Sequence, residues 1–183
     1  MEQHPQYEEI IRQVKVAGFD IKVGDGAHVE VKEVVDADGH VIRVEKTLYV
    51  QENMRYLDLE HELGHIKQLA RFGNSIPPTQ RVIDQENGSF KTYPNQQGVL
   101  TTWQNTITEY HNRLDEFLRL HERGASPELL KEHADGVEDW YQAYWKKGIK
   151  QGYSKSQKQW AERYFPDLAE LRYRYLEIAQ TRK

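Results

Sequence analysis

Two histidines and a glutamate stand close together in the stretch His61-Glu62-Leu63-Gly64-His65. Histidines four residues apart on a helix share one face, so their imidazoles can bind a single metal ion. Glu62 then lies beside the open coordination position, where its carboxylate can accept a proton from a water molecule. This His-Glu-x-x-His pattern is typical of zinc metallopeptidases. It predicts His61 and His65 as zinc ligands and Glu62 as the catalytic base.

The residues around the motif predict a helix over 54–73 that positions it. At about 100° per residue, the apolar side chains cluster on one side and predict the core face: Tyr56, Leu59, Leu63, Ile66 and Ala70. His61 and His65 fall on nearly the opposite side, unlike ordinary core histidines. The alternative is a pair of solvated histidines on a surface helix. Gly64 costs roughly 1 kcal/mol relative to alanine inside a helix, which suggests close approach of another element or of substrate.

Length and composition limit the classes of protein. A chain of 183 residues is expected to form one domain with a sizeable core. The net charge of −4 and the pI near 6.1, without a basic run, argue against nucleic acid as a partner. The chain has no cysteine, so a metal must be held by histidine, glutamate or aspartate.

No apolar stretch approaches membrane-spanning length, and the N-terminal residues lack the apolar core of a signal peptide. We therefore expect no membrane partner and a cytoplasmic location, with any export signal carried by a larger precursor.

The N-terminal part, 1–53, is predicted to contain one helix and a small sheet. Ile10, Ile11 and Val14 supply the apolar face of a helix over 5–17. Short strands separated by turn residues follow over 19–23, around 29–31 and over 41–50, and we interpret them as an antiparallel meander. The last strand leads directly into the motif helix. Its residues 47–50 are therefore predicted to bind an extended peptide by strand addition.

The remaining chain divides into a loop and a helical part. Residues 74–99 are rich in proline, glycine and asparagine, which predicts a long loop with one short element around Val82. Residues 100–183 are predicted to be helical, with helices ending near Gly124, running from Pro127 toward Lys147, and running from Leu168 to about Gln180. The expected fold class is α+β, in one domain over 1–183.

A catalytic zinc normally has three protein ligands, so a third ligand must be found. The metzincin spacing would place glycine and histidine where the chain has Gln68 and Arg71, so the ligand must come from farther along. Glu109 on the next long helix is the preferred candidate, as in the gluzincin arrangement. His111 is the rival and lies nearer the apolar stripe of that helix, whereas a ligand should face the cleft. Glu116 is a weaker alternative.

A peptidase site also requires a hydrogen-bond donor that stabilises the oxyanion formed in the transition state. Tyr110 and Arg113, on the same helix as Glu109, are the candidates, and the sequence does not choose between them. The alternative interpretation for all the polar residues of this helix is an ordinary solvated face.

Three stretches together resemble the zincin-like metallopeptidase toxin domains of bacterial polymorphic toxins. They are Leu59 to Gln68, the segment Glu109-Tyr-His-Asn-Arg-Leu-Asp-Glu-Phe-Leu-Arg-Leu120, and the tail with Trp160 and Phe165-Pro-Asp-Leu168. The resemblance implies a zincin-like α+β fold, one zinc ion per chain and a protein or peptide substrate. It also implies delivery into a competitor cell as the effector domain of a larger toxin, with an immunity protein as a further partner.

The mechanism expected from the motif is hydrolysis of a peptide bond by metal-activated water, with Glu62 moving the proton. Two alternatives belong to other classes. One is a zinc-binding interaction module without catalytic activity, and the other is a metal-free helical binding protein in which the motif arose by chance.

Overall fold

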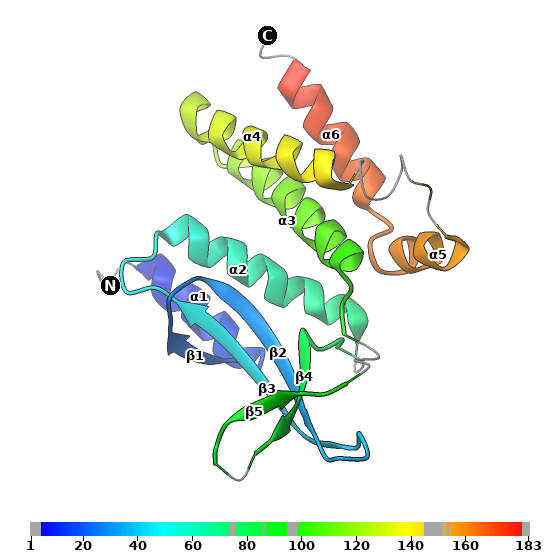
Figure 1. The fold of residues 1–183 in the computed structure, drawn as a ribbon. Helices are drawn as coiled ribbons and strands as arrows, with labels where there is room; N and C mark the ends of the chain where they lie inside the picture. The colour runs from blue at the N-terminus through cyan, green and yellow to red at the C-terminus, as the bar shows by residue number, and fades with distance from the viewer. Residues whose placement is uncertain are drawn as a thin grey trace. The chain divides into compact units, whose positions relative to one another are not determined.

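The computed structural model describes residues 5–73, 76–85, 87–94, 99–144, 152 and 154–180. The chain divides into two compact units, Met1–Leu100 and Thr101–Lys183 (Figure 1). The length had suggested one domain. The division falls where the sequence changes from the predicted loop to the predicted helical part. The fold class is α+β, as expected, with a mixed sheet in the first unit and helices in both.

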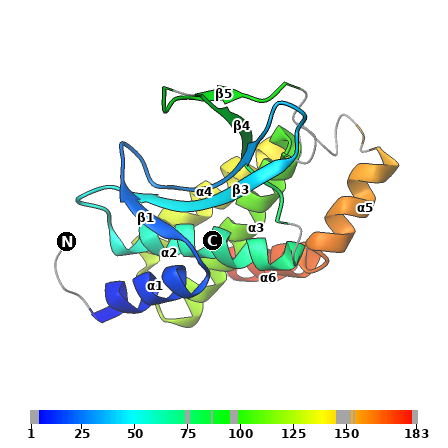
Figure 2. The ribbon, with the colours of Figure 1, turned by 90° about the horizontal axis from the view of Figure 1, so that it is seen from below.

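In the described residues of the first unit, a five-stranded sheet is combined with two α-helices. Helices α1 (Pro5–Val16) and α2 (Tyr56–Leu69) pack against each other, and α2 packs against β2 (Figures 1 and 2). A 3₁₀ turn over Ala70–Phe72 continues α2. The strands are β1 (Asp20–Val23), β2 (His28–Val35), β3 (Val41–Val50), β4 (Gln80–Asp84) and β5 (Phe90–Thr92). Their order in the sheet is β1-β3-β2-β4-β5.

The predicted antiparallel meander is corrected by the pairing of these strands. β2 and β3 do form the expected antiparallel hairpin, but β1 skips its neighbour in sequence and pairs in parallel with β3. β4 also joins β2 in parallel, so the sheet is mixed. Parallel neighbours need a crossover connection, and β2 with its flanking turns forms the connection between β1 and β3.

The prediction that residues 47–50 bind an extended peptide is wrong for the same reason. Thr47–Val50 of β3 pairs with β1 on one side, and its residues Thr47 to Tyr49 pair with β2 on the other. Strand addition requires an edge strand with unpaired backbone groups. This part of β3 is a central strand, and the edges of the sheet are β1 and β5.

The predicted loop over 74–99 contains β4 and β5. Its entry is held by Thr79, whose backbone N–H donates to Val31 O (2.7 Å) and whose hydroxyl also donates to Val31 O (3.0 Å). The backbone N–H of Val31 donates back to the Thr79 hydroxyl (3.1 Å). Val82 is the one buried residue of β4, and all three residues of β5 are exposed. The apolar alternation that predicts strands is therefore weak here.

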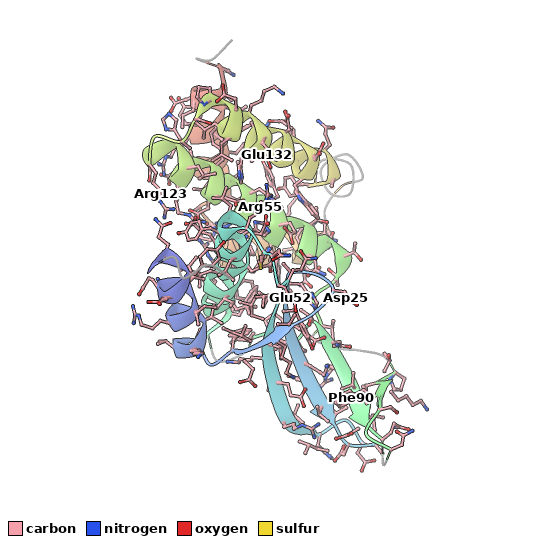
Figure 3. All side chains as sticks on the ribbon, turned by 90° about the vertical axis from the view of Figure 1, so that its left-hand side faces the viewer. Asp25, Glu52, Arg55, Phe90, Arg123 and Glu132 are labelled. Atoms are coloured by element: carbon pink, nitrogen blue, oxygen red, sulfur yellow. The ribbon has the colours of Figure 1, made fainter. Side chains whose placement is uncertain are left out.

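The core of the first unit lies between the helices and the sheet. Its most deeply buried side chains come from α1, the hairpin and α2: Val14, Val31, Val34, Val35, Leu48 and Leu59. Tyr7 of α1 donates its hydroxyl proton to Met54 O (3.1 Å), just before α2 begins. The β1–β2 and β3–α2 loops meet where Gln51 Nε2 donates to Asp25 O (3.0 Å), and Figure 3 shows Asp25 and Glu52 in these two loops.

The described residues of the second unit form four helices: α3 (Thr102–Glu122), α4 (Pro127–Tyr144), α5 (Lys155–Tyr164) and α6 (Leu168–Gln180). Helices α4 and α6 both pack on α3, and their core includes Ile107, Leu114 and Val137. Thr101 and Gln104 form a capping box at the start of α3, and Gly124 ends that helix with a φ of +70°. The predicted continuation of α4 to Lys147 lies outside the described residues.

None of the helices in the described part of the chain is both long and apolar enough to cross a membrane.

Candidate metal centre

Helix α2 carries the His-Glu-x-x-His motif, close to the bounds predicted for it. Its apolar residues Leu59, Leu63 and Ile66 are buried as expected. Its polar face is largely buried too, since His61 is 8 % exposed and Glu62 is 7 % exposed. The solvated surface pair, one of the two interpretations of the sequence, therefore does not apply to His61. Arg55, labelled in Figure 3 just before the helix, donates to both carboxylate oxygens of Asp58 (3.0 Å each).

The two imidazoles lie one turn apart and turn the same nitrogen toward each other. His61 Nε2 and His65 Nε2 are 3.2 Å apart, with perpendicular rings whose centroids are 4.8 Å apart. Two nitrogens bound to one tetrahedral zinc at about 2.0–2.1 Å lie roughly 3.3 Å apart. The observed separation of the two Nε2 atoms therefore fits a pair of ligands to one zinc ion.

Gln68 determines which nitrogen of His65 is available to a metal. His65 Nδ1 lies 3.0 Å from Gln68 Oε1, and the glutamine is 5 % exposed. Because an amide oxygen only accepts hydrogen bonds, Nδ1 carries the proton and donates it. The lone pair of His65 then resides on Nε2, which faces His61. This is the role that outer partners of metal-bound histidines usually have.

The role of Gln68 was not predicted from the sequence, where the residue only marked a departure from the metzincin spacing. The signal that pointed to it is the spacing of three residues from His65, which puts both side chains on one helix face.

Glu62 follows His61 directly and lies three positions before His65. On a helix, Glu62 lies one turn from both Leu59 and His65, so its side chain neighbours His65 and also borders the core face. The side chain is buried, so water has limited access to the carboxylate. The motif residues therefore combine two aligned imidazole nitrogens with one buried carboxylate on a single rigid helix.

The three candidates for a further ligand all lie on α3, and two of them are engaged within the second unit. His111 is 4 % exposed, and its Nε2 lies 3.2 Å from both carboxylate oxygens of Asp167. Its ring packs on Phe165, with centroids 5.0 Å apart. The helical-wheel expectation that His111 lies toward the core is confirmed. Glu109, in contrast, is half-buried.

Glu116 is buried in the second unit and has two polar neighbours there. Its Oε2 lies 3.2 Å from Arg113 Nη1 and 3.5 Å from His133 Nδ1, and its side chain is 4 % exposed. Arg113, a candidate for the oxyanion donor, is therefore paired with a glutamate one turn away on its own helix.

Tyr110, the other candidate for the oxyanion donor, is part of the aromatic core of the second unit. Its ring stacks on the ring of Tyr144 of α4, with centroids 5.3 Å apart. It also contacts the ring of Tyr141, on α4 as well, with centroids 5.7 Å apart. Burial holds the pKa of its phenol well above the ordinary value. The hydroxyl therefore stays protonated.

Possible metal-ligating side chains also meet at the turn between β2 and β3, namely Asp36, Asp38 and His40. The Asp36 carboxylate accepts the backbone N–H of His40 (2.8 Å), and this hydrogen bond lowers the pKa of that carboxyl group. Asp38 and His40 are exposed. An aspartate that accepts hydrogen bonds from the backbone of its own turn is common in Asx turns without a metal. We therefore assign no metal to these three residues.

Comparisons of this chain with protein-family models, with curated proteins and with solved structures find no match.

Proposed function

We propose that this protein is a zinc-dependent metallopeptidase. The observation that carries the proposal is the pair of Nε2 atoms of His61 and His65, 3.2 Å apart on one helix that also bears Glu62. If the motif had arisen by chance, the two Nε2 atoms would have no reason to lie at the distance that a shared zinc ion requires. Nor would His65 be expected to have a buried partner that fixes its tautomer, as Gln68 does.

The donor set that we assign is two imidazoles and one carboxylate, His61, His65 and Glu109. This composition is one of the usual sets for catalytic zinc and leaves the fourth position open. Glu109 is preferred because the helical wheel turns it toward the cleft, whereas His111 lies toward the core and contacts Asp167, and Glu116 contacts Arg113 and His133. Use of either rival as a ligand would break a buried polar contact inside the second unit, which is costly.

Zinc, when bound, acts as a Lewis acid that lowers the pKa of water and polarises a carbonyl oxygen. The protein supplies the proton transfer. Glu62 takes the proton from the attacking water and later gives it to the nitrogen of the leaving amine, so one carboxylate acts first as base and then as acid. Gln68 keeps His65 in the tautomer that has a lone pair on Nε2.

The biological setting that we propose is that of a bacterial toxin effector, and its support is the sequence resemblance described above. In this setting the substrate is a protein of the target cell, and an immunity protein protects the producing cell.

The deciding experiment measures metal and cleavage on the purified protein. Elemental analysis should find about one zinc ion per chain, and an unfolded protein substrate should be cleaved in the absence but not in the presence of a chelator. Glu62→Gln should keep the zinc and abolish cleavage, because the amide has nearly the same shape but cannot take up the proton.

Glu60→Gln is the matched control for Glu62→Gln, since Glu60 is also buried on α2, at 6 % exposed. It should leave cleavage in place. Zinc without cleavage would instead establish a zinc-binding interaction module. Absence of zinc from a folded preparation supplied with the metal would establish the metal-free helical binding protein.

A further inference from the structure

Strand β1 forms an open edge of the sheet. Among the described residues it pairs with β3 alone, on one side (Figure 1). Three of its four residues, Asp20, Lys22 and Val23, are exposed, and Val23 is 65 % exposed. An edge strand of this kind can pair with a strand of another molecule.

Two residues of β1 turn their backbone groups away from the sheet. The N–H of Gly24, directly after the strand, donates to Val50 O of β3 at 3.0 Å. Because successive residues of a strand turn their backbone groups to opposite edges, Ile21 and Val23 direct theirs outward. Ile21 can therefore exchange two hydrogen bonds with a residue of an antiparallel neighbour.

The side chains of Asp20 and Lys22 carry opposite charges on one face of β1, because they lie two positions apart. With Glu45 and Thr47 of β3 they line an open groove of about 440 Å³. Neither charge has an ion-pair partner in the described part of the chain, and Glu45 pairs instead with Arg43 at 2.9 Å. The edge therefore carries one available acid and one available base.

The spacing of these two charges selects one way in which β1 can pair with a copy of itself. If the two Ile21 residues lie opposite each other in antiparallel strands, Asp20 of each copy lies opposite Lys22 of the other. These are the close, non-hydrogen-bonded pairs, with Cα atoms about 4.5 Å apart, so the opposite charges attract. A shift of two residues in either direction would oppose two lysines or two aspartates, which is unfavourable.

We propose that β1 is a dimerisation edge, at which two copies of this chain join as antiparallel strands about a two-fold axis at Ile21. Charges on an edge strand usually prevent such pairing, but these two are complementary to their own copy. The ladder is short, so the dimer belongs to the weak class of interfaces. A two-fold pair uses both β1 edges and stops at two copies. The proposal does not depend on zinc or on peptidase activity.

The experiment measures the dimer by sedimentation velocity of the full chain, from micromolar to millimolar concentration. Asp20→Lys and Lys22→Asp each place like charges opposite each other and should weaken dimerisation by about tenfold or more. In a mixture of these two variants, a basic strand meets an acidic one, so heterodimers should form with about the affinity of the parent. Lys91→Asp, on the other edge strand β5, is the control and should dimerise like the parent.

A cross-linking experiment tests the register, because the chain has no cysteine of its own. In the proposed dimer the Cα atoms of the two Ile21 residues lie about 5.5 Å apart, within the range of a disulfide. The two Val23 residues are four positions out of register, about 13 Å along the strands. Mild oxidation should therefore cross-link Ile21→Cys efficiently and Val23→Cys poorly, although Val23 is the more exposed residue.

Several results would overturn the proposal. A parent chain that stays monomeric up to millimolar concentration would exclude the dimer. Parent-like dimerisation of either charge variant, or no recovery in the mixture of the two folded variants, would show that Asp20 and Lys22 are not opposite each other. Preferential cross-linking of Val23→Cys would exclude the register, and weakening by Lys91→Asp would move the interface to β5. Circular dichroism establishes that each variant is folded.

Discussion

Gln68 Oε1 accepts a hydrogen bond from His65 Nδ1 at 3.0 Å, and this contact directs the lone pair of the imidazole to Nε2. The two residues are three positions apart on α2, so the helix itself brings them together. The same helix brings His61 Nε2 to 3.2 Å from His65 Nε2. Both the ligand pair and its orienting residue therefore belong to one rigid element.

The first prediction concerns this orienting contact. Gln68→Ala should weaken zinc binding about 10- to 100-fold, because His65 can then rotate or carry its proton on Nε2. A zinc competition titration with a chromogenic chelator measures the change. Gln159→Ala, at an exposed position of α5, is the control and should bind zinc like the parent. Parent-like affinity of folded Gln68→Ala would show that the tautomer is determined by another group.

The second prediction separates the three candidates for the third ligand. Glu109→Ala should lose zinc at chelator concentrations at which His111→Ala and Glu116→Ala retain it, since a site with two protein ligands is too weak for a catalytic metal. The measurement is the same competition titration on the three variants. If His111→Ala loses zinc while folded and Glu109→Ala does not, the site has three histidines and our assignment is wrong.

The third prediction gives the rivals of Glu109 a structural role. His111→Ala should lower the free energy of unfolding by about 1–3 kcal/mol, because the buried side chain loses its contacts with Asp167 and Phe165. Glu116→Ala should have a similar or larger effect, since Arg113 and His133 lose their buried partner. Glu109→Ala should cost less. Urea unfolding of the metal-free proteins measures all three, and equal stabilities would contradict these roles.

The fourth prediction concerns Tyr110 and pH. Burial raises the pKa of Tyr110 above 10.0, the ordinary value that its phenol has in the unfolded chain. Above this pH the unfolded chain releases a proton that the folded protein keeps, so stability should fall as the pH rises beyond about 10. Tyr110→Phe should reduce this fall. At neutral pH it should leave stability unchanged or raise it, because the hydroxyl has no described partner.

Chemical unfolding at pH 7, 9, 10 and 11 tests this expectation. Tyr175 makes a similar contribution, since burial raises the pKa of its phenol as well, so Tyr175→Phe is the matched comparison. Tyr173 is 64 % exposed, and a hydrogen bond with Glu177 raises the pKa of its phenol. Because water screens this exposed contact, Tyr173→Phe should alter the loss of stability at high pH less than Tyr110→Phe does. A clear loss of stability in Tyr110→Phe at pH 7 would show that the hydroxyl is paired in solution.

The fifth prediction tests the proposed toxin setting. Expression of the parent protein in bacterial cytoplasm should slow growth, and Glu62→Gln expressed to the same level should relieve the effect. Growth curves and immunoblots measure both. Equal growth of the two strains would count against toxicity in that host, while the assay with purified protein would still decide on peptidase chemistry.

The spacing of residues in the sequence was enough to predict the relationships between side chains of a single helix. The spacing of His61, Glu62 and His65 is converted into three-dimensional proximity by helix geometry, which needs no other part of the chain. The bounds of α1, α3 and α6 were also close to the prediction, because strong amphipathic periodicity and glycine or proline signals are local properties. The core-facing orientation of His111 followed from the same periodicity.

Only the tertiary structure decided which distant segments are neighbours. The parallel pairing of β1 with β3 and of β4 with β2 depends on backbone hydrogen bonds that leave no periodic signal in short polar strands. The Asp167 partner of His111 lies 56 residues away in the chain, so no local pattern can reveal it. The same holds for the contacts of Tyr110 on α3 with Tyr141 and Tyr144 on α4, which join two helices that no local pattern pairs.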